Sequence, residues 1–290
     1  MCCKKILIAA ALAVTAIAAQ AECLSDAQVA DMAERIAART PALTPQGLSE
    51  ADGACTRAKL HALLEKRHGP VIGYKAGLTN PAVQKRFHHD QPVWGRLYQG
   101  MVLPGGTVVE AAFGARALFE ADMLVRVKSA AINQATTPME VLQAIDQVIP
   151  FIELPDLVVQ APPQLNGPAI SAINVGARLG VAGAPVEVPL TRAERYALLN
   201  ALRDMTVVLT DGTGAELAKG RGTDILGHPL NAVVWLASAL AREGLIMKPG
   251  QLISLGSFSP LLPPRPGLTV GATYEGLPAP EPVSVSAAFK

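Results

Sequence analysis

Charged residues and aromatic residues are both scarce in this chain of 290 residues, and their scarcity limits what the protein can bind. Charged side chains make up 17% of the sequence and aromatic ones 4%, and the formal net charge is only +1. The sequence has no basic stripe with interleaved aromatic residues, so nucleic acid is excluded as an expected partner. Half of the residues are hydrophobic, which excludes a disordered chain and favours a globular protein that binds small molecules.

Long apolar runs are absent except at the N-terminus. There a short cationic start precedes an apolar run that ends in Ala19-Gln20-Ala21, which is typical of a secretory signal peptide cleaved after Ala21. A membrane anchor is the alternative, but the run is shorter than the roughly 18–20 apolar residues that a span needs. We therefore expect residues 1–21 to be a signal peptide and the mature protein to be periplasmic, with no stable membrane insertion after cleavage.

Cysteine is rare, and removal of the expected signal peptide leaves only Cys23 and Cys55, too few ligands for a zinc centre. Two thiols in an oxidising compartment can pair. Each of them falls at the beginning of a predicted helix, so a bridge between the two helices is geometrically reasonable. Unpaired cysteines that pack as small apolar residues are the alternative, and we favour the disulfide.

The pattern of apolar residues changes near residue 69. Before it, helices are expected at 24–38 and around 55–67, so residues 22–68 are interpreted as a helical N-terminal segment. After it, in residues 69–290, short apolar runs alternate with Gly/Pro turns, which is typical of strands. The strands are too irregularly spaced for alternating βαβ units, which predicts an α+β fold dominated by a bent mixed sheet.

Particular segments of residues 69–290 carry more specific expectations. The run A-I-N-V-G-A-R-L-G at 172–180 is interpreted as a strand, and Asp211-Gly212 as a hairpin turn. Three further helices are expected between the strands. They cover 137–148, 191–202 and the stretch from His228 to Gly244.

Two acids interrupt the apolar run L-F-E-A-D-M-L-V-R-V at residues 118–127. Glu120 and Asp122 are two apart, so they share one face if the run is a strand. Neighbouring carboxylates repel each other unless a cation lies between them. Glu153 occurs in a similar context, V-I-P-F-I-E-L-P. Three such acids, with no Cys or His nearby, favour Mg²⁺ or Mn²⁺ as the bound ion. The alternative is that Glu120 and Asp122 face solvent at a strand edge.

Five motifs, taken in order, resemble a known family. They are G-Y-K-A-G-L-T-N-P-A-V-Q, D-Q-P-V-W-G-R-L, F-E-A-D, V-I-P-F-I-E and G-R-G-T-D-I-L-G-H-P-L-N-A-V-V-W-L-A. Together they are similar to the 2-keto-4-pentenoate hydratase branch of the fumarylacetoacetate hydrolase family, over roughly residues 25–290. The resemblance implies that residues 69–290 form a catalytic domain with the family's β-roll, and that the protein is a homo-oligomer.

The resemblance also implies a site. Its E-x-E pattern and later Glu match the metal ligands Glu120, Asp122 and Glu153, with Asp122 one methylene shorter than the usual Glu. Lys75 matches the family's motif lysine, beside the bound substrate, and is the candidate catalytic residue. The positions implied to contact substrate are Lys75, Asn174, Gly256 and Ser257.

The sequence departs from the family at residues that handle protons or polar groups. Val93 replaces the second acid of D-Q-P-D-[FY]-G, Leu157-Val158 replaces a Ser-Arg pair, and only Asn174 remains of an A-D-N motif.

From the resemblance as a whole we expect a Mg²⁺- or Mn²⁺-dependent hydratase or lyase of a short 2-hydroxy-dienoate or 2-oxo-enoate. A 2-oxo-enoate decarboxylase and a catalytically reduced keto-acid-binding protein are the alternatives.

Overall fold

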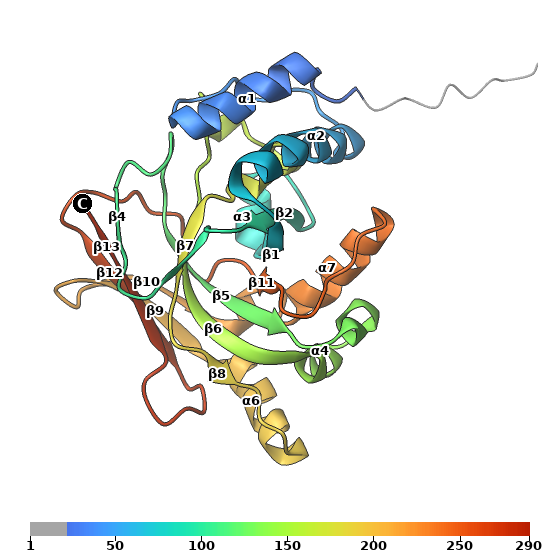
Figure 1. The fold of residues 1–290 in the computed structure, drawn as a ribbon. Helices are drawn as coiled ribbons and strands as arrows, with labels where there is room; N and C mark the ends of the chain where they lie inside the picture. Colours follow the sequence, from blue (N-terminus) through green and yellow to red (C-terminus); the bar gives the residue numbers. More distant parts are fainter. Residues whose placement is uncertain (1–21) are drawn as a thin grey trace, which may run out of the picture.

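The computed structural model of the protein describes residues 22–290, and the expected signal peptide lies outside the described residues. Figure 1 shows a mixture of helices and curved sheets, with α1 and α2 on one side and α4, α6 and α7 on the other. The predicted α+β class and bent mixed sheet are confirmed. Among residues 22–290, no helix combines the length and hydropathy that crossing a membrane requires.

Seven α-helices and four short 3₁₀ turns are distributed along residues 22–290. The α-helices are α1 (Asp26–Ala38), α2 (Glu50–His68), α3 (Pro81–Arg86), α4 (Pro138–Ala144), α5 (Gly167–Ala172), α6 (Arg192–Asp204) and α7 (Asn231–Arg242). The 3₁₀ turns are η1 (Ala130–Gln134), η2 (Pro162–Gln164), η3 (Asn174–Gly176) and η4 (Gly222–Asp224).

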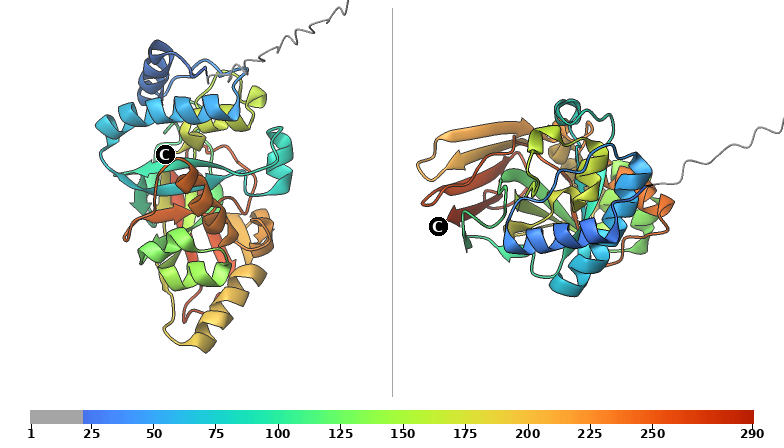
Figure 2. Two further views of the ribbon diagram at one scale, coloured as in Figure 1. Left: turned by 90° about the vertical axis from the view of Figure 1, so that its right-hand side faces the viewer. Right: turned by 90° about the horizontal axis from the view of Figure 1, so that it is seen from above.

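The strands of residues 22–290 form two sheets. The larger sheet has the order β2-β1-β11-β5-β6-β7-β3, with β8 also paired to β6, and the smaller has the order β10-β9-β12-β13-β4. Figure 2 shows the smaller sheet at one end of the molecule. The larger sheet contains β1 (Val71–Gly77), β2 (Val93–Tyr98), β3 (Val102–Pro104), β5 (Glu120–Val127), β6 (Ile145–Leu154), β7 (Leu179–Ala182), β8 (Val186–Glu187) and β11 (Leu252–Ser254). The smaller contains β4 (Val108–Val109), β9 (Thr206–Asp211), β10 (Glu216–Arg221), β12 (Thr269–Glu275) and β13 (Ser284–Phe289).

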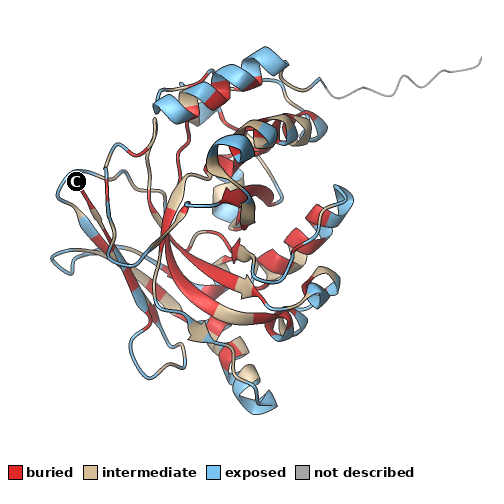
Figure 3. Ribbon diagram, viewed as in Figure 1, coloured by how far each residue is buried: buried red, intermediate tan, exposed pale blue. Residues whose placement is uncertain are grey.

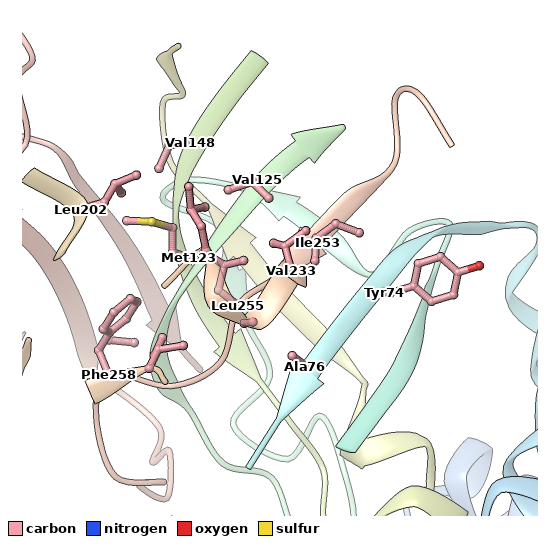
Figure 4. Packing of buried hydrophobic residues seen from close by; sticks show 14 of the residues in the cluster. Tyr74, Ala76, Met123, Val125, Val148, Leu202, Val233, Ile253, Leu255 and Phe258 are labelled. Carbon is pink, nitrogen blue, oxygen red and sulfur yellow. The ribbon is translucent and has the colours of Figure 1, made fainter. Parts of the chain in front are cut away.

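Two large hydrophobic cores and a smaller cluster around Leu124 and Phe151 pack against the larger sheet. Alternate residues of β5, such as Met123 and Val125, pack with α6, α7 and the smaller sheet, as Figure 4 shows around Leu202 and Val233. On the other side, apolar residues of α1, α2 and α5 form a second core. The strands between them are buried on both faces, and Figure 3 shows β5 and β6 as largely buried.

Local capping explains where the first two helices begin. Ser25 caps α1 and forms a capping box with Gln28, in agreement with the predicted helix at 24–38. Helix α2 begins five residues before the predicted 55–67, because Ser49 and Asp52 form a second capping box. Cys55 therefore lies inside α2 rather than at its beginning.

The predicted disulfide is present in the structure. Cys23 and Cys55 are joined, with their Cα atoms 5.6 Å apart and a sequence separation of 32. The bond ties the segment that precedes α1 to the first half of α2. It thereby fixes the helical pair that covers one side of the larger sheet.

Two predicted elements differ in the structure. The helix expected at 137–148 ends at Ala144, because Ile145 begins β6 and pairs with Val127 of β5. The strand expected at 172–180 is wrong: Asn174 and Val175 adopt left-handed backbone angles, so the chain bends and β7 begins only at Leu179. The hairpin predicted at Asp211-Gly212 is confirmed between β9 and β10.

Loss of the disulfide is expected to destabilise the protein. Closing a loop of this length restricts the unfolded chain, so the double variant Cys23→Ser/Cys55→Ser should lose about 2–4 kcal/mol in free energy of unfolding. Denaturant titration of the mature chain measures this loss. Dithiothreitol should destabilise the parent protein and leave the double variant unchanged. Equal sensitivity of the two proteins to the reductant would contradict the expectation.

Candidate metal and substrate site

The register between β5 and β6 places the three predicted acids on one face of the larger sheet. Glu120 lies directly opposite Glu153 in this antiparallel pair. Asp122 is two residues further along β5, so it points to the same side. The alternative that Glu120 and Asp122 face solvent does not hold for Asp122, which is fully buried, whereas Glu120 is half-buried.

Lys75 approaches the acids from β1, two strands away from β5. Its Nζ forms an ion pair with Glu153 and donates a second hydrogen bond to the Val175 carbonyl, at 3.1 Å. The Lys75 and Glu153 side chains are both only 3% exposed. A buried ion pair loses its hydration, so it persists only where further hydrogen bonds compensate. The Val175 carbonyl supplies one of them and fixes the position of the ammonium group.

Asp122 is held by donors from the protein. Its Oδ2 accepts a hydrogen bond from Ser254 Oγ at 2.5 Å, and its Oδ1 accepts one from the Gly256 amide at 3.0 Å. Ser254 ends β11, which pairs directly with β5, so it reaches the acid from the neighbouring strand. These bonds turn Asp122 toward β11, and it does not line the neighbouring cavity.

The carboxyl groups outnumber the cations that face them. The single ammonium of Lys75 faces the buried acids Asp122 and Glu153 and the half-buried Glu120, so part of their charge stays unbalanced. Burial, reinforced by repulsion from Glu153, raises the pKa of Glu120 to about 8, although Lys75 and Ser257 oppose the shift. Burial and repulsion from Glu153 also raise the pKa of Asp122 well above its ordinary value. A further cation bound at the site would therefore reduce the repulsion between the carboxylates.

A cavity of about 260 Å³ opens beside these acids. Lys75, Glu120 and Glu153 form its inner end, and Gly256 and Ser257 line it after β11. Most of the remaining wall is apolar. A Cβ at Gly256 would lie 2.0 Å from Thr79 Oγ1, and its φ is +107°, so glycine is required for the close approach of these two segments.

Asn174 occupies a different place from the one that the resemblance implied. Its side chain bonds the backbone of Arg96 twice, accepting from the amide at 2.8 Å and donating to the carbonyl at 3.0 Å, and it does not line the cavity. Asn174 and Val175 both have φ near +55°, a strained conformation for a β-branched residue. Asn174 thereby anchors the bend that presents the Val175 carbonyl to Lys75, while its substrate contact stays a prediction.

The departures from the family leave an apolar wall. Val93 is buried and lies opposite Gly77 in the β1–β2 pair, and Gly77 lines the cavity. Leu157 and Val175 line the cavity as well. Two residues of the site were missed in the sequence: Ser254, which bonds Asp122, and Arg86, which lines the cavity from α3. Only the tertiary structure brings them near the acids.

The donor atoms of these residues are of the type that binds a hard divalent ion, but the side chains are not gathered around one point. Across residues 22–290, no three His, Cys, Asp or Glu side chains are placed so that they could hold an ion together. Glu153 is engaged by Lys75 and Asp122 by Ser254 and Gly256. The donors are nevertheless all carboxylate oxygens on adjacent strands, the ligand type that Mg²⁺ and Mn²⁺ prefer. The uncompensated charge gives such an ion an electrostatic reason to bind.

The raised pKa of Glu120 predicts how stability depends on pH. Unfolded, Glu120 titrates near its ordinary value of 4.5, whereas folding raises its pKa to about 8. Between these values the unfolded chain has released a proton that the folded chain retains, so rising pH favours unfolding. In chelator-treated protein, this contribution should lower the unfolding free energy steadily from pH 5 to 8. Denaturant titrations at several pH values measure the trend.

The variant Glu120→Gln provides the comparison for this trend. Glutamine stays neutral, so the fall in stability with pH should be shallower than in the parent protein. Glu216→Gln, at an exposed position of β10, should retain the parent slope. Identical slopes for the parent and Glu120→Gln would show that Glu120 titrates normally in the fold.

Curated proteins with similar sequences share two activities in their names. The 4-oxalocrotonate decarboxylase of Pseudomonas putida is 28% identical over 241 residues, covering 82% of this chain and 85% of that protein. The 2-keto-4-pentenoate hydratase of Burkholderia vietnamiensis is 28% identical over 216 residues, covering 74% of this chain and 78% of that protein. No protein-family model matches the chain.

Solved structures share the fold. The 4-oxalocrotonate decarboxylase from Pseudomonas putida G7, complexed with magnesium and adipate, superposes with a TM-score of 0.78 at 26% identity, covering 92% of this chain and 99% of that one. A fumarylpyruvate hydrolase from Pseudomonas aeruginosa, in complex with Mn²⁺ and pyruvate, superposes with a TM-score of 0.54 at 12% identity, covering 75% of this chain and 89% of that one, and this likeness shows the fold alone. These matches confirm that the chain resembles the 2-keto-4-pentenoate hydratase branch of the fumarylacetoacetate hydrolase family.

Proposed function

We propose that the protein is a divalent-metal-dependent lyase of the hydratase or decarboxylase type, acting on a short 2-oxo acid or its 2-hydroxy-dienoate form. The observation that carries this proposal is the excess of buried carboxyl groups over cations at the inner end of the cavity. The names of the similar proteins, and the magnesium in one solved relative, support the same chemistry.

Glu120, Asp122 and Glu153 are the residues that would hold the ion. When bound, Mg²⁺ or Mn²⁺ supplies a Lewis acid that stabilises negative charge on the oxygen atoms of a keto acid. The shared face of β5 and β6 keeps the three acids close together, and the hydrogen bonds from Ser254 and Gly256 orient Asp122.

Lys75 is the residue placed to hold a proton beside the substrate. Its ammonium has three donors, and the contacts within residues 22–290 use two of them, to Glu153 and to Val175. The side chain also lines the cavity, so the third donor can meet a substrate carboxylate or enol oxygen. In this role Lys75 balances the substrate's charge and takes part in proton transfer to carbon.

The apolar wall makes decarboxylation a second candidate for the specific reaction. Addition of water needs a polar group that positions the water and handles its proton. Val93 and Leu157 supply neither, and Val93 stands where hydratases of the family commonly have an acid. Loss of CO₂ needs only stabilised negative charge and a proton donor near carbon. We therefore propose decarboxylation alongside hydration as the reaction that the protein catalyses.

Turnover by the Mg²⁺-loaded protein tests the proposal. Absorbance of a 2-hydroxy-dienoate reports hydration, and release of CO₂ from a 2-oxo-enedioate reports decarboxylation. Glu153→Gln and Lys75→Met should each lower kcat by at least about 100-fold, the usual contribution of a positioned acid–base or charge-stabilising group. Glu216→Gln, on the exposed side of β10, should stay within about twofold of the parent protein.

Two other results would change the proposal. Full activity in chelator, or in Glu153→Gln, would exclude the acids as a metal centre. Thermal stabilisation by a 2-oxo acid without any turnover would instead identify a catalytically reduced binding protein, the other function that the sequence left open.

We also propose that the protein is exported to the periplasm. The N-terminal sequence resembles a signal peptide, and the Cys23–Cys55 disulfide supports an oxidising compartment. Expression of the full chain in a Gram-negative host, followed by fractionation and mass spectrometry, tests this proposal. The periplasmic fraction should contain a chain that begins at Glu22. An intact chain confined to the cytoplasm would contradict it.

A further inference from the structure

Tyr274 of β12 reaches from the smaller sheet to the two strands that carry the acids. Its side chain is buried and packs in the same core as Met123 of β5. Met123 follows Asp122 on the strand, so the two side chains point to opposite faces. Tyr274 therefore approaches β5 and β6 from behind the acids, and it does not line the cavity.

The Tyr274 hydroxyl contacts the backbones of both strands. It donates a hydrogen bond to the Asp122 carbonyl and accepts one from the Phe151 amide at 3.1 Å. The Phe151 carbonyl oxygen is also within reach, at 3.0 Å. Asp122 and Phe151 face each other in the register of β5 and β6. A side chain of the smaller sheet thus takes part in the hydrogen bonding of this one pair.

The acids are attached to the backbone at or beside this pair. Asp122 belongs to it, and Glu120 and Glu153 form the facing pair two residues away along the two strands. The hydroxyl and the carboxyl groups therefore act on the same stretch of backbone from opposite faces of the sheet. The backbone positions that Tyr274 fixes determine how far Asp122 lies from the other two carboxyl groups.

Tyr274 is itself held in place by its neighbours. It pairs with Val207 of β9, and its amide donates a hydrogen bond to the Val283 carbonyl at 2.8 Å. The ring of Phe258 meets the ring of Tyr274 edge-on, with the centroids 6.2 Å apart. The Phe258 amide in turn donates to the carbonyl of Ala121, between the two acids of β5, at 2.8 Å. The hydroxyl is therefore carried by a well-packed side chain.

Repulsion between the acids explains why such a support matters. Carboxyl groups that face each other across two strands favour a displacement of one strand relative to the other. A divalent ion, in contrast, needs its oxygen ligands at closely defined separations. A hydroxyl bonded to both backbones opposes the displacement before any ion arrives. It thereby lowers the cost of gathering the ligands around the ion.

We propose that Tyr274 is a positioning residue, which sets the spacing of the metal-binding acids through the backbones of β5 and β6. The inference rests on the proposed function, because that function assigns Glu120, Asp122 and Glu153 as the residues that would hold the ion. Tyr274 supplies no ligand and lies outside the cavity, so it acts through the two strands. Removal of its hydroxyl should weaken metal binding while every ligand stays in the protein.

Titration of Tyr274→Phe with Mn²⁺, followed by electron paramagnetic resonance, tests this assignment. The substitution keeps the ring and removes only the hydroxyl. The dissociation constant for Mn²⁺ should rise at least about tenfold, as is usual when a group that orients a metal ligand is lost. Tyr98→Phe is the matched control, because the hydroxyl of this fully buried tyrosine bonds His61 Nδ1, at 3.0 Å, and supports no acid. Its dissociation constant should stay within about twofold of the parent value.

The Mg²⁺ dependence of turnover distinguishes positioning from general damage to the fold. In Tyr274→Phe, the Mg²⁺ concentration that gives half-maximal activity should rise about tenfold, and kcat should recover at saturating Mg²⁺ because mass action refills the weakened site. A low kcat at every Mg²⁺ concentration, with an unchanged half-maximal concentration, would overturn the proposal. So would an equal Mn²⁺ affinity in Tyr274→Phe and the parent protein.

A second variant separates this inference from the proposed reaction. Phe258→Leu keeps the Tyr274 hydroxyl but loosens the ring that carries it, so Mn²⁺ affinity should fall by a smaller factor than in Tyr274→Phe. A parent protein that loses Mn²⁺ affinity in both variants but never turns over substrate would sustain the role of Tyr274 and refute the lyase. An active parent protein whose affinity is unchanged in both variants would refute the role of Tyr274 and sustain the lyase. A parent protein that binds no Mn²⁺ would refute both.

Discussion

The pairing of Glu120 with Glu153 across β5 and β6 is the constraint on which the site depends. Two carboxyl groups placed opposite each other in a buried antiparallel pair repel strongly, and Asp122 adds a third to the same face. Lys75 offsets one charge, and burial, reinforced by repulsion from Glu153, raises the pKa values of Glu120 and Asp122. A fold that retains this arrangement bears an electrostatic cost, and a bound divalent cation gives the most direct relief.

The surrounding structure maintains this arrangement by burying both faces of the larger sheet. On one face, β5 packs with α6, α7 and the smaller sheet. On the other, the core around α1, α2 and α5 adjoins the cavity and shields the acids from bulk water. The left-handed bend at Asn174 and Val175 belongs to this second layer. Its strain is tolerated because Asn174 is bonded twice to β2 and because the bend supplies the carbonyl that holds Lys75.

The cavity combines a polar inner end with an apolar wall, and this contrast shapes the proposed chemistry. Charge is concentrated where the reacting oxygen atoms would lie, and the low-polarity wall strengthens electrostatic interactions there. Val93, which lies opposite the cavity residue Gly77, offers no group that would activate a water molecule. At the opening, Arg86 adds a single cation that is free of local acids within the described residues.

Local patterns in the sequence determined the elements that depend on neighbouring residues. The capped start of α1, the hairpin after β9 and the shared face of Glu120 and Asp122 follow from spacing along the chain, and so does the amphipathic character of the helices. The acids, Lys75 and Gly256 were identified because their motifs are contiguous. The family resemblance supplied the association of distant motifs, which spacing alone does not give.

The tertiary structure decided everything that depends on residues far apart in the chain. Strand order and register bring Lys75 to Glu153 and Ser254 to Asp122. They also place Asn174 where it anchors the backbone of β2. The bend that replaced the strand expected at 172–180 has the same origin. Arg86 reaches the cavity only because α3 crosses its opening. Alternation fixes the face on which a side chain lies, whereas its neighbours on that face are chosen by the packing of the whole chain.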